Sequence, residues 1–281
     1  MGLIDRLFRR GGSPAPAPTP AEKPAPQEEP AAPPVLLAGN LQGMGDREGQ
    51  EDSFALVNLT PQEEQEPRGL LAVVADGMGG MEDGKAASQC AVDAFLGDFA
   101  RREEDRSVPD WLYTCALSAS CQVFDCFGGR GGTTLVAVHI QEDILHWVSV
   151  GDSAIFLKRD GGVFQLNREH TYLNLLYDRE LDEERTDKSR AEMDPDARRL
   201  TAFVGMDQLA QVDLSLRPWW LRRGDTLLLC SDGISGVLTP PELLEAMSLP
   251  PVEGCALLEA LVLERHIPEQ DNYTGVMLAY R

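Results

Sequence analysis

Acidic residues stand at the ends of several apolar runs in this chain of 281 residues. Asp76 follows LLAVVA, Asp152 follows HWVSVG and Asp232 follows DTLLLCS. Asp271 comes just before YTGVMLAY, and the pair Glu51 and Asp52 comes just before SFALVNL. Runs this apolar belong in a core, so their ends should converge. Crowded carboxylates repel each other, and an all-oxygen ligand set favours Mg²⁺ or Mn²⁺, so the pattern predicts a metal-dependent enzyme.

One arginine and one glycine add to this chemistry. Arg47 lies in REGQEDS, after the glycine-rich stretch GNLQGMG and before an apolar run, which favours a cleft over a surface ion pair. Arginine is the side chain best suited to a bidentate grip on phosphate. Gly77, directly after Asp76, has no Cβ and can bring its carbonyl oxygen close to an ion.

The composition limits the class of protein. The formal net charge is -21, and the pI is near 4.5. Nucleic acid is excluded as a partner because phosphate binding needs an excess of Lys and Arg; the acidity serves solubility equally well. The six cysteines form no Cys-x-x-Cys pair, and most have apolar neighbours, so we expect reduced, buried thiols.

The first 34 residues differ in composition from the rest. Residues 11–34 form a Pro/Ala-rich linker that is expected to be disordered. Residues 1–10 form a short basic head with an apolar helical face, which could bind a partner, contact a membrane surface or be a disordered leader. No run reaches the about 20 apolar residues of a membrane span, and neither a signal peptide nor a myristoylation signal fits, so we expect a cytoplasmic monomer.

Residues 35–281 are predicted to form the catalytic domain. Its pattern is α+β with antiparallel sheets, because strand-like runs come in pairs joined by hairpin-type loops. Residues 167–200 are rich in charge and lack apolar periodicity, which fits either a flap-like lid or a solvated helical excursion. We expect strands at 53–59, 69–75, 133–140, 144–150, 154–158, 226–230 and 274–280, and helices at 84–104, 109–127, 240–247 and 252–265.

Six short motifs follow one another in a fixed order: RxxxED, DGMGG, GGTT, GDS, SDG and DN. Each is weak alone, but together they closely resemble the type 2C protein phosphatase family, the metal-dependent serine/threonine phosphatases, in its bacterial style. The match runs over roughly residues 36–281. The motifs begin at Arg47, Asp76, Gly131, Gly151, Ser231 and Asp271.

The resemblance implies a four-layer α-β-β-α sandwich with two metal ions, Mn²⁺ or Mg²⁺, at one end of the sheets. It implies that Asp76 bridges both ions. Asp232 and Asp271 would serve one ion, and Glu51 with the Gly77 carbonyl the other. Asp52 would orient metal-bound water, and Asp152 with Asp232 would hold a weaker third ion.

The implied reaction is hydrolysis of phosphoserine and phosphothreonine in proteins by a metal-bridged hydroxide, with Arg47 and the ions holding the phosphate oxygens. The substrates would be phosphoproteins made by a bacterial serine/threonine kinase. None of the cysteines has the Arg of a Cys-x₅-Arg phosphatase.

The chain departs from the family pattern at three positions. Met78 stands where many eukaryotic relatives have a histidine thought to be the general acid, and methionine cannot donate a proton. Ala154 stands where the family often has Arg, and Phe203 also departs from the usual pattern. None of the three is a predicted metal ligand.

Three rival interpretations stay open. Residues 79–86 resemble a phosphate-binding P-loop, but Ala86 replaces the Ser or Thr needed on Mg²⁺ and the loop contains two acidic residues. The chain could be a non-catalytic phosphoprotein-binding or scaffold member of the same fold. It could also be a phosphoesterase for small molecules with a similar two-metal site.

Overall fold

The structure is a computed structural model that describes residues 35–59, 68–78, 83–102, 106–185 and 188–281. From Pro34 onward the chain forms one compact unit. The predicted head and linker lie outside the described residues, and so does half of the P-loop-like stretch, at 79–82. No described helix is both long enough and apolar enough to cross a bilayer.

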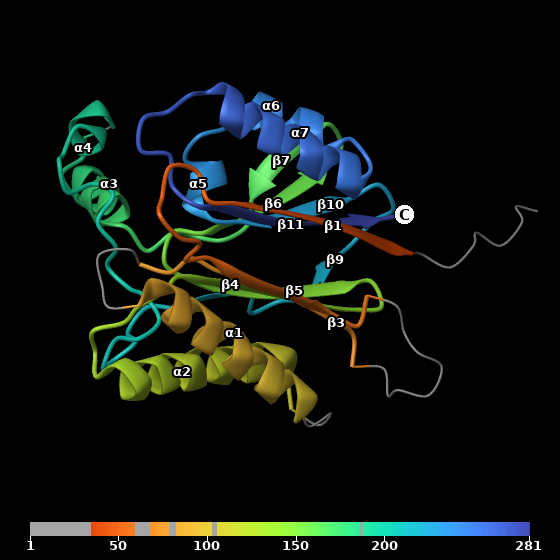
Figure 1. Ribbon diagram of the computed structural model, residues 1–281, viewed down its shortest axis with the longest axis horizontal. Coiled ribbons are helices and arrows are strands. Elements are labelled where there is room, and N and C mark those ends of the chain that lie inside the picture. The colour runs from red at the N-terminus through yellow and green to blue at the C-terminus, as the bar shows by residue number, and fades with distance from the viewer. Residues whose placement is uncertain (1–34, 60–67, 79–82, 103–105, 186–187) are drawn as a thin grey trace, which may run out of the picture. The chain divides into compact units, whose positions relative to one another are not determined.

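Two antiparallel sheets form the centre of the unit (Figure 1). The first has the order β1 (Leu36–Gly43), β11 (Tyr273–Tyr280), β10 (Thr226–Cys230), β6 (Ala154–Arg159) and β7 (Gly162–Gln165). The second has the order β2 (Ser53–Val57), β3 (Leu70–Ala75), β4 (Leu135–Gln141), β5 (Ile144–Val150) and β8 (Asp213–Leu214), and the two-residue β9 (Trp219–Trp220) also pairs with β5.

Helices cover the outer face of each sheet, so the predicted α-β-β-α sandwich is confirmed (Figure 1). The pair α1 (Gly84–Ala100) and α2 (Val108–Phe127) packs on the second sheet, and the pair α6 (Pro240–Met247) and α7 (Pro251–Glu264) packs on the first. The described residues also form α3 (Tyr172–Asp182), α4 (Ser189–Glu192) and α5 (Asp232–Ser235).

The inner strands are apolar on both faces because each sheet lies between its partner sheet and a helix pair. Every residue of β3, β10 and β11 is buried. A cluster of buried apolar side chains, which includes Val74, Val138 and Leu229, lies between the two sheets and joins them. Burial of this kind is the main force that holds a strand end in place.

The structure adds strands that the sequence patterns did not predict, and β1 is the longest of them; the others include the two-residue β8 and β9. β1 pairs with β11 over its full length, from Leu36 opposite Tyr280 to Gly43 opposite Tyr273. Its sequence LLAGNLQG contains two glycines and an asparagine, which have low strand propensity, so local pattern reasoning overlooked it. Pairing with a buried neighbour outweighs that propensity.

Two expectations need adjustment. The charged region 167–200 contains α3 and α4, as a helical excursion would, while a lid function for it stays a prediction. All six cysteines are free thiols, but only Cys115, Cys230 and Cys255 are buried; Cys121 and Cys126 are exposed on α2 because they lie on its outer side.

Candidate metal centre

The strand ends bring the predicted carboxylates together from both sheets. Asp76 follows β3 and Asp152 follows β5, both in the second sheet, while Asp232 follows β10 and Asp271 precedes β11 in the first. Asp52 lies just before β2 and is fully buried. The charges of the other four all act on Asp76, which places the five carboxyl groups around one region.

The GGTT motif fixes the backbone of Asp76. Its carbonyl oxygen accepts hydrogen bonds from the Thr133 hydroxyl at 2.7 Å and from the Thr134 N–H at 2.8 Å. The Asp76 N–H donates to the Thr134 hydroxyl at 3.0 Å, and that hydroxyl lies 2.7 Å from the Ser153 hydroxyl. In the sequence, GGTT indicates only the start of a strand. In the structure, the Thr134 hydroxyl of this motif connects Asp76 to Ser153, next to Asp152.

Burial raises the pKa of the two innermost carboxyl groups. Removal from water, followed by the charges of its neighbours, raises the pKa of Asp76 well above its usual range. Removal from water also raises the pKa of Asp52 to about 6, although contacts with Thr274 and Ser231 offset part of the effect. The Ser231 hydroxyl donates to Oδ2 of Asp52 at 2.9 Å.

The outer carboxyl groups are affected in the same direction. Removal from water, then the charges of Asp232 and Glu169, raises the pKa of Asp152 to about 7. The same two causes, with Asp271 as the neighbouring charge, raise the pKa of Asp232. The Asp232 residue is exposed to solvent, whereas Asp52 is buried, so Asp232 keeps more of its hydration than Asp52 does. The charge of Arg198 partly opposes the rise at Asp232.

Glu169 and Arg198, both from the region 167–200, were absent from the predicted site. No local pattern marks either of them, because each reaches the centre only through the path of the chain around α3 and α4.

The donor set fits a divalent cation. Oδ1 of Asp52 is buried and has no hydrogen-bond partner among the described residues, so one carboxylate oxygen is left without a proton donor. The neighbouring groups offer only oxygen atoms, which suits Mg²⁺ or Mn²⁺. Among the described residues no three acidic or other metal-binding side chains are gathered around one point at binding distance.

Gly77 and Glu51 form the other side of the centre. A Cβ atom on Gly77 would lie 2.6 Å from the carbonyl oxygen of Glu51 and 2.3 Å from that of Gly84, so no side chain fits there. The Glu51 carboxylate turns toward Gly84: a Cβ on Gly84 would lie 3.0 Å from its Oε1. The approach at Gly77 requires glycine for reasons of space, because the atoms that a Cβ would meet belong to the backbone.

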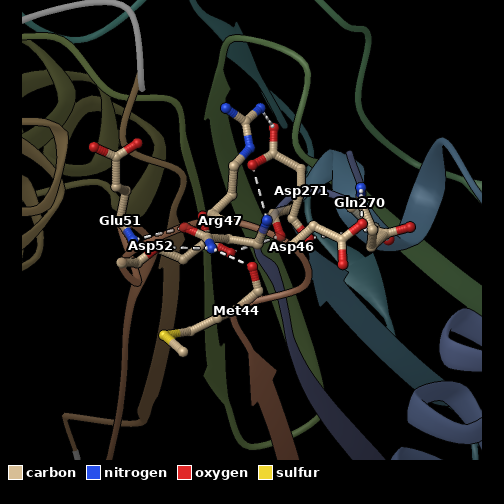
Figure 2. A network of polar contacts seen from close by, with 11 residues as sticks. Met44, Asp46, Arg47, Glu51, Asp52, Gln270 and Asp271 are labelled. Atoms are coloured by element: carbon tan, nitrogen blue, oxygen red, sulfur yellow. Dashed lines mark hydrogen bonds and ion pairs between the residues drawn. The ribbon is translucent and has the colours of Figure 1, made fainter. Parts of the chain in front are cut away.

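Arg47 contacts a predicted metal ligand instead of standing apart. Its Nη2 donates to Oδ2 of Asp271 at 2.6 Å, and both side chains are nearly half exposed, at 46% and 44%. Figure 2 shows the Arg47 guanidinium beside the Asp271 carboxylate, with the Glu51 carboxylate to the left of this pair. Hydrogen bonding to Asp271, followed by its negative charge, raises the pKa of Arg47.

Asn272, the second residue of the DN motif, holds the loop that carries Arg47 and Glu51. Its Nδ2 donates to the carbonyl oxygens of Met44 at 2.8 Å and Gly49 at 3.0 Å. Its Oδ1 accepts the Glu51 N–H at 2.7 Å. The side chain is 3% exposed, so it joins three points of the loop from inside the protein. The motif marked this residue, but only the contacts show what it does.

The three departures from the family pattern have structural settings. Met78 and Phe203 lie beside one another, because a Cβ on Gly132 would be 2.9 Å from Sδ of Met78 and 2.8 Å from a ring carbon of Phe203. Ala154 is fully buried in the cluster under α6 and α7, where a longer cationic side chain would not fit.

Comparisons with known proteins agree with this geometry. Residues 50–253 match the family described as "Protein phosphatase 2C". The serine/threonine protein phosphatase PstP of Mycobacterium tuberculosis H37Rv is 32% identical over 218 residues, which is 74% of this chain but 40% of that protein. The serine/threonine phosphatase stp of Listeria innocua is 29% identical over 188 residues, covering 63% of this chain and 71% of that protein.

Solved structures give the same picture. The crystal structure of the Mycobacterium tuberculosis phosphatase PstP/Ppp has a TM-score of 0.71 at 27% identity, covering 87% of this chain and 98% of that one. The catalytic domain of PstP in complex with two manganese ions has a TM-score of 0.69 at 26% identity, covering 88% and 99%.

Proposed function

This chain belongs to the protein phosphatase 2C family, and we propose that it hydrolyses phosphoserine and phosphothreonine in proteins with divalent cations held at the strand ends. The proposal is carried by five aspartates whose charges act on one another beside one exposed guanidinium. Similarity to serine/threonine phosphatases supports the reaction, and the two manganese ions bound to the PstP catalytic domain support the cofactor.

Each ligand has a proposed role. Asp76 lies between the two sheets and would contact both ions, since the charges of the other four aspartates of the centre act on it. Asp232 and Asp271 would hold one ion, and Glu51 with the Gly77 carbonyl the other. Mn²⁺ or Mg²⁺ would serve. A third, weaker ion at Asp152 and Asp232 is supported by the nearby charge of Glu169.

When bound, the ions supply a water activated for attack at neutral pH and offset charge on the phosphate oxygens. The chain's own residues position the reactants. Asp52 would accept a hydrogen bond from the attacking water through Oδ1, the oxygen that has no protein partner. Asn272 would keep Glu51 and Arg47 at a fixed distance from that water through the loop it holds.

Arg47 would exchange partners during the reaction. In the structure it donates to Asp271, and both are accessible from solvent. The guanidinium would then bind the arriving phosphate, and Asp271 would be free to hold a cation. Because Met78 cannot protonate the leaving seryl or threonyl oxygen, we propose that water does so.

The proposed substrates are the products of a serine/threonine kinase, and the proposed compartment is the cytoplasm. Six free cysteines support a reducing compartment. Residues 35–281 would act as the catalytic domain and 167–200 as a flap that selects substrates. Deleting part of 172–195 should then reduce hydrolysis of a phosphopeptide more than hydrolysis of a small aryl phosphate. Equal losses on both would contradict recognition by the flap.

The deciding test is hydrolysis of a phosphothreonine peptide with Mn²⁺, with Mg²⁺ and with a chelator. We expect turnover only with metal, and loss of turnover in Asp76→Ala. Asp125→Ala, which removes an exposed carboxylate from α2, is the matched control and should behave like the natural sequence. Activity that survives both chelation and Asp76→Ala would overturn the mechanism.

A further inference from the structure

The outer edge of β1 is open. β1 is the last strand of its sheet, and β11 is its only neighbour in the described part of the chain. Val35 and Arg281 exchange both backbone hydrogen bonds, each at 2.9 Å. In an antiparallel ladder, hydrogen-bonded pairs alternate with pairs that are not hydrogen-bonded. Starting from Leu36, the N–H and C=O groups of every second residue therefore point away from β11. These are the groups of Leu36, Ala38, Asn40 and Gln42.

Those outward groups repeat at a fixed spacing. Two-residue steps in a strand place them about 7 Å apart along the edge. No hydrogen bond to a backbone N–H or C=O of these four residues occurs within the described residues. The strand also has no Lys, Pro or other residue that commonly protects an edge from pairing.

The edge forms the floor of a groove. A cavity of about 450 Å³ is lined by Asn40 and Gln42 of β1, by Phe54 of β2, and by Val252, Ala256 and Glu259 of α7, among others. Figure 1 shows β1 between α7 on one side and the second sheet on the other. An extended chain laid on this floor would direct alternate side chains toward α7 and toward Phe54.

The walls determine which occupant fits. A second copy of this chain would bring its own α7 and second sheet against the same walls, while a single extended peptide has neither. Val252 is 70% exposed, which offers an apolar contact. Glu259 is the only charged residue among those lining the groove, so a basic side chain is favoured opposite it.

We propose that this groove binds an extended segment of a partner protein, which pairs with β1 as an added strand. The segment would alternate apolar and polar residues and carry a Lys or Arg opposite Glu259. The main-chain hydrogen bonds would supply affinity and the groove walls would supply selectivity. The proposal does not depend on the phosphatase activity, because the groove contains none of the residues assigned to the metal centre.

The test begins with a phage-displayed library of twelve-residue peptides selected on the full chain. We expect enrichment of peptides with alternating apolar residues and at least one basic residue. The best peptide is then labelled, and its affinity is measured by fluorescence anisotropy. Failure to enrich any such sequence would overturn the proposal.

Two pairs of variants locate the binding. Asn40→Pro removes an outward N–H without removing a β1–β11 hydrogen bond, and we expect it to weaken binding at least tenfold. Asn40→Ala keeps that N–H and should stay within twofold. Ala256→Glu places a carboxylate in the groove and should change the dissociation constant of the labelled peptide at least fivefold. Ala260→Glu, one turn further along α7, should leave that dissociation constant unchanged. Circular dichroism and thermal unfolding confirm that each variant is folded.

A chemical control separates strand pairing from simple apolar adsorption. The same peptide, N-methylated at every second residue on the edge that faces β1, keeps its side chains but loses its donors. We expect at least a tenfold loss of affinity. Equal binding of the methylated peptide, or of Asn40→Pro, would refute strand addition. A dimer in sedimentation velocity that Asn40→Pro abolishes would identify a second copy as the occupant instead.

Discussion

Strand β10 has an aspartate at each end, and the two have opposite surroundings. Asp225, just before the strand, is 2% exposed and is held by Arg159 through Nε at 2.9 Å and Nη2 at 2.6 Å. The Arg222 N–H also donates to it at 2.7 Å. Asp232, just after the strand, faces four other aspartates.

The difference separates a structural charge from a functional one. At the Asp225 end the buried carboxylate has a bidentate partner, so its desolvation is offset inside the protein. At the Asp232 end the buried carboxylate of Asp52 has an oxygen with no hydrogen-bond partner in the described part of the chain. A fold that leaves buried charge uncompensated at only one end of a strand points to an external cation there.

The largest expected effect is on turnover at the Asp232 end. Asp76→Asn keeps the size of the side chain but removes the charge proposed to contact both ions, so we expect kcat to fall by at least about 1,000-fold. Steady-state hydrolysis of an aryl phosphate over a range of Mn²⁺ concentrations measures it. Recovery of full kcat at high Mn²⁺ would show that Asp76 is not essential to both ions.

The second prediction sets two buried aspartates against each other. Asp225→Asn leaves the Arg159 guanidinium without its counter-charge and should lower the free energy of unfolding by about 3 kcal/mol. Asp52→Asn removes a buried negative charge that other aspartates repel, and it should leave the metal-free free energy of unfolding equal or higher. Denaturant unfolding in the presence of a chelator measures both free energies of unfolding. Equal decreases in the two variants would contradict the distinction between a structural and a functional charge.

The third prediction concerns the loop at the rim. Asn272→Asp keeps the shape but cannot donate to Met44 and Gly49. Loss of two buried hydrogen bonds should loosen the loop and raise the Mn²⁺ concentration needed for half-maximal activity by about tenfold. Thermal unfolding of the metal-free variant serves as the control: a collapse of the whole fold would mean that Asn272 is structural only.

The smallest effect belongs to a buried histidine of β4 away from the metal centre. His139 is fully buried; its Nε2 lies 2.7 Å from the Arg68 carbonyl oxygen and 2.9 Å from Nη1 of Arg102. Burial, with the charge of Arg102 as a lesser cause, lowers the pKa of His139 to about 4.

Because this pKa is lower in the folded state than in the unfolded one, the unfolded state binds more protons between about pH 6.5 and pH 4. The free energy of unfolding should therefore fall as pH drops through that window, by on the order of 1–2 kcal/mol between pH 7 and pH 5. His139→Gln should reduce this dependence. An unchanged pH profile in the variant would assign the acid sensitivity to other groups.

The sequence indicated the site more completely than it indicated the fold. Apolar runs ending in Asp76, Asp152 and Asp232 fix where those side chains lie, because a strand buried on both faces has little freedom at its end. The helix at 240–247 was predicted to the residue, since Thr239 and Pro240 form a capped start. β1 was missed because its order comes from pairing with β11.

The sequence by itself determined the order of motifs, the acidic residues proposed as ligands and the α+β class, because these depend on residue type and short-range spacing. Only the tertiary structure decided which charges are compensated. Asp225 pairs with Arg159, and Asp271 pairs with Arg47. Oδ1 of Asp52 has no hydrogen-bond partner among the described residues. Asn272 holds a loop that lies more than 200 positions earlier in the chain. Contacts over such separations depend on how the two sheets pack, and no local pattern contains that information.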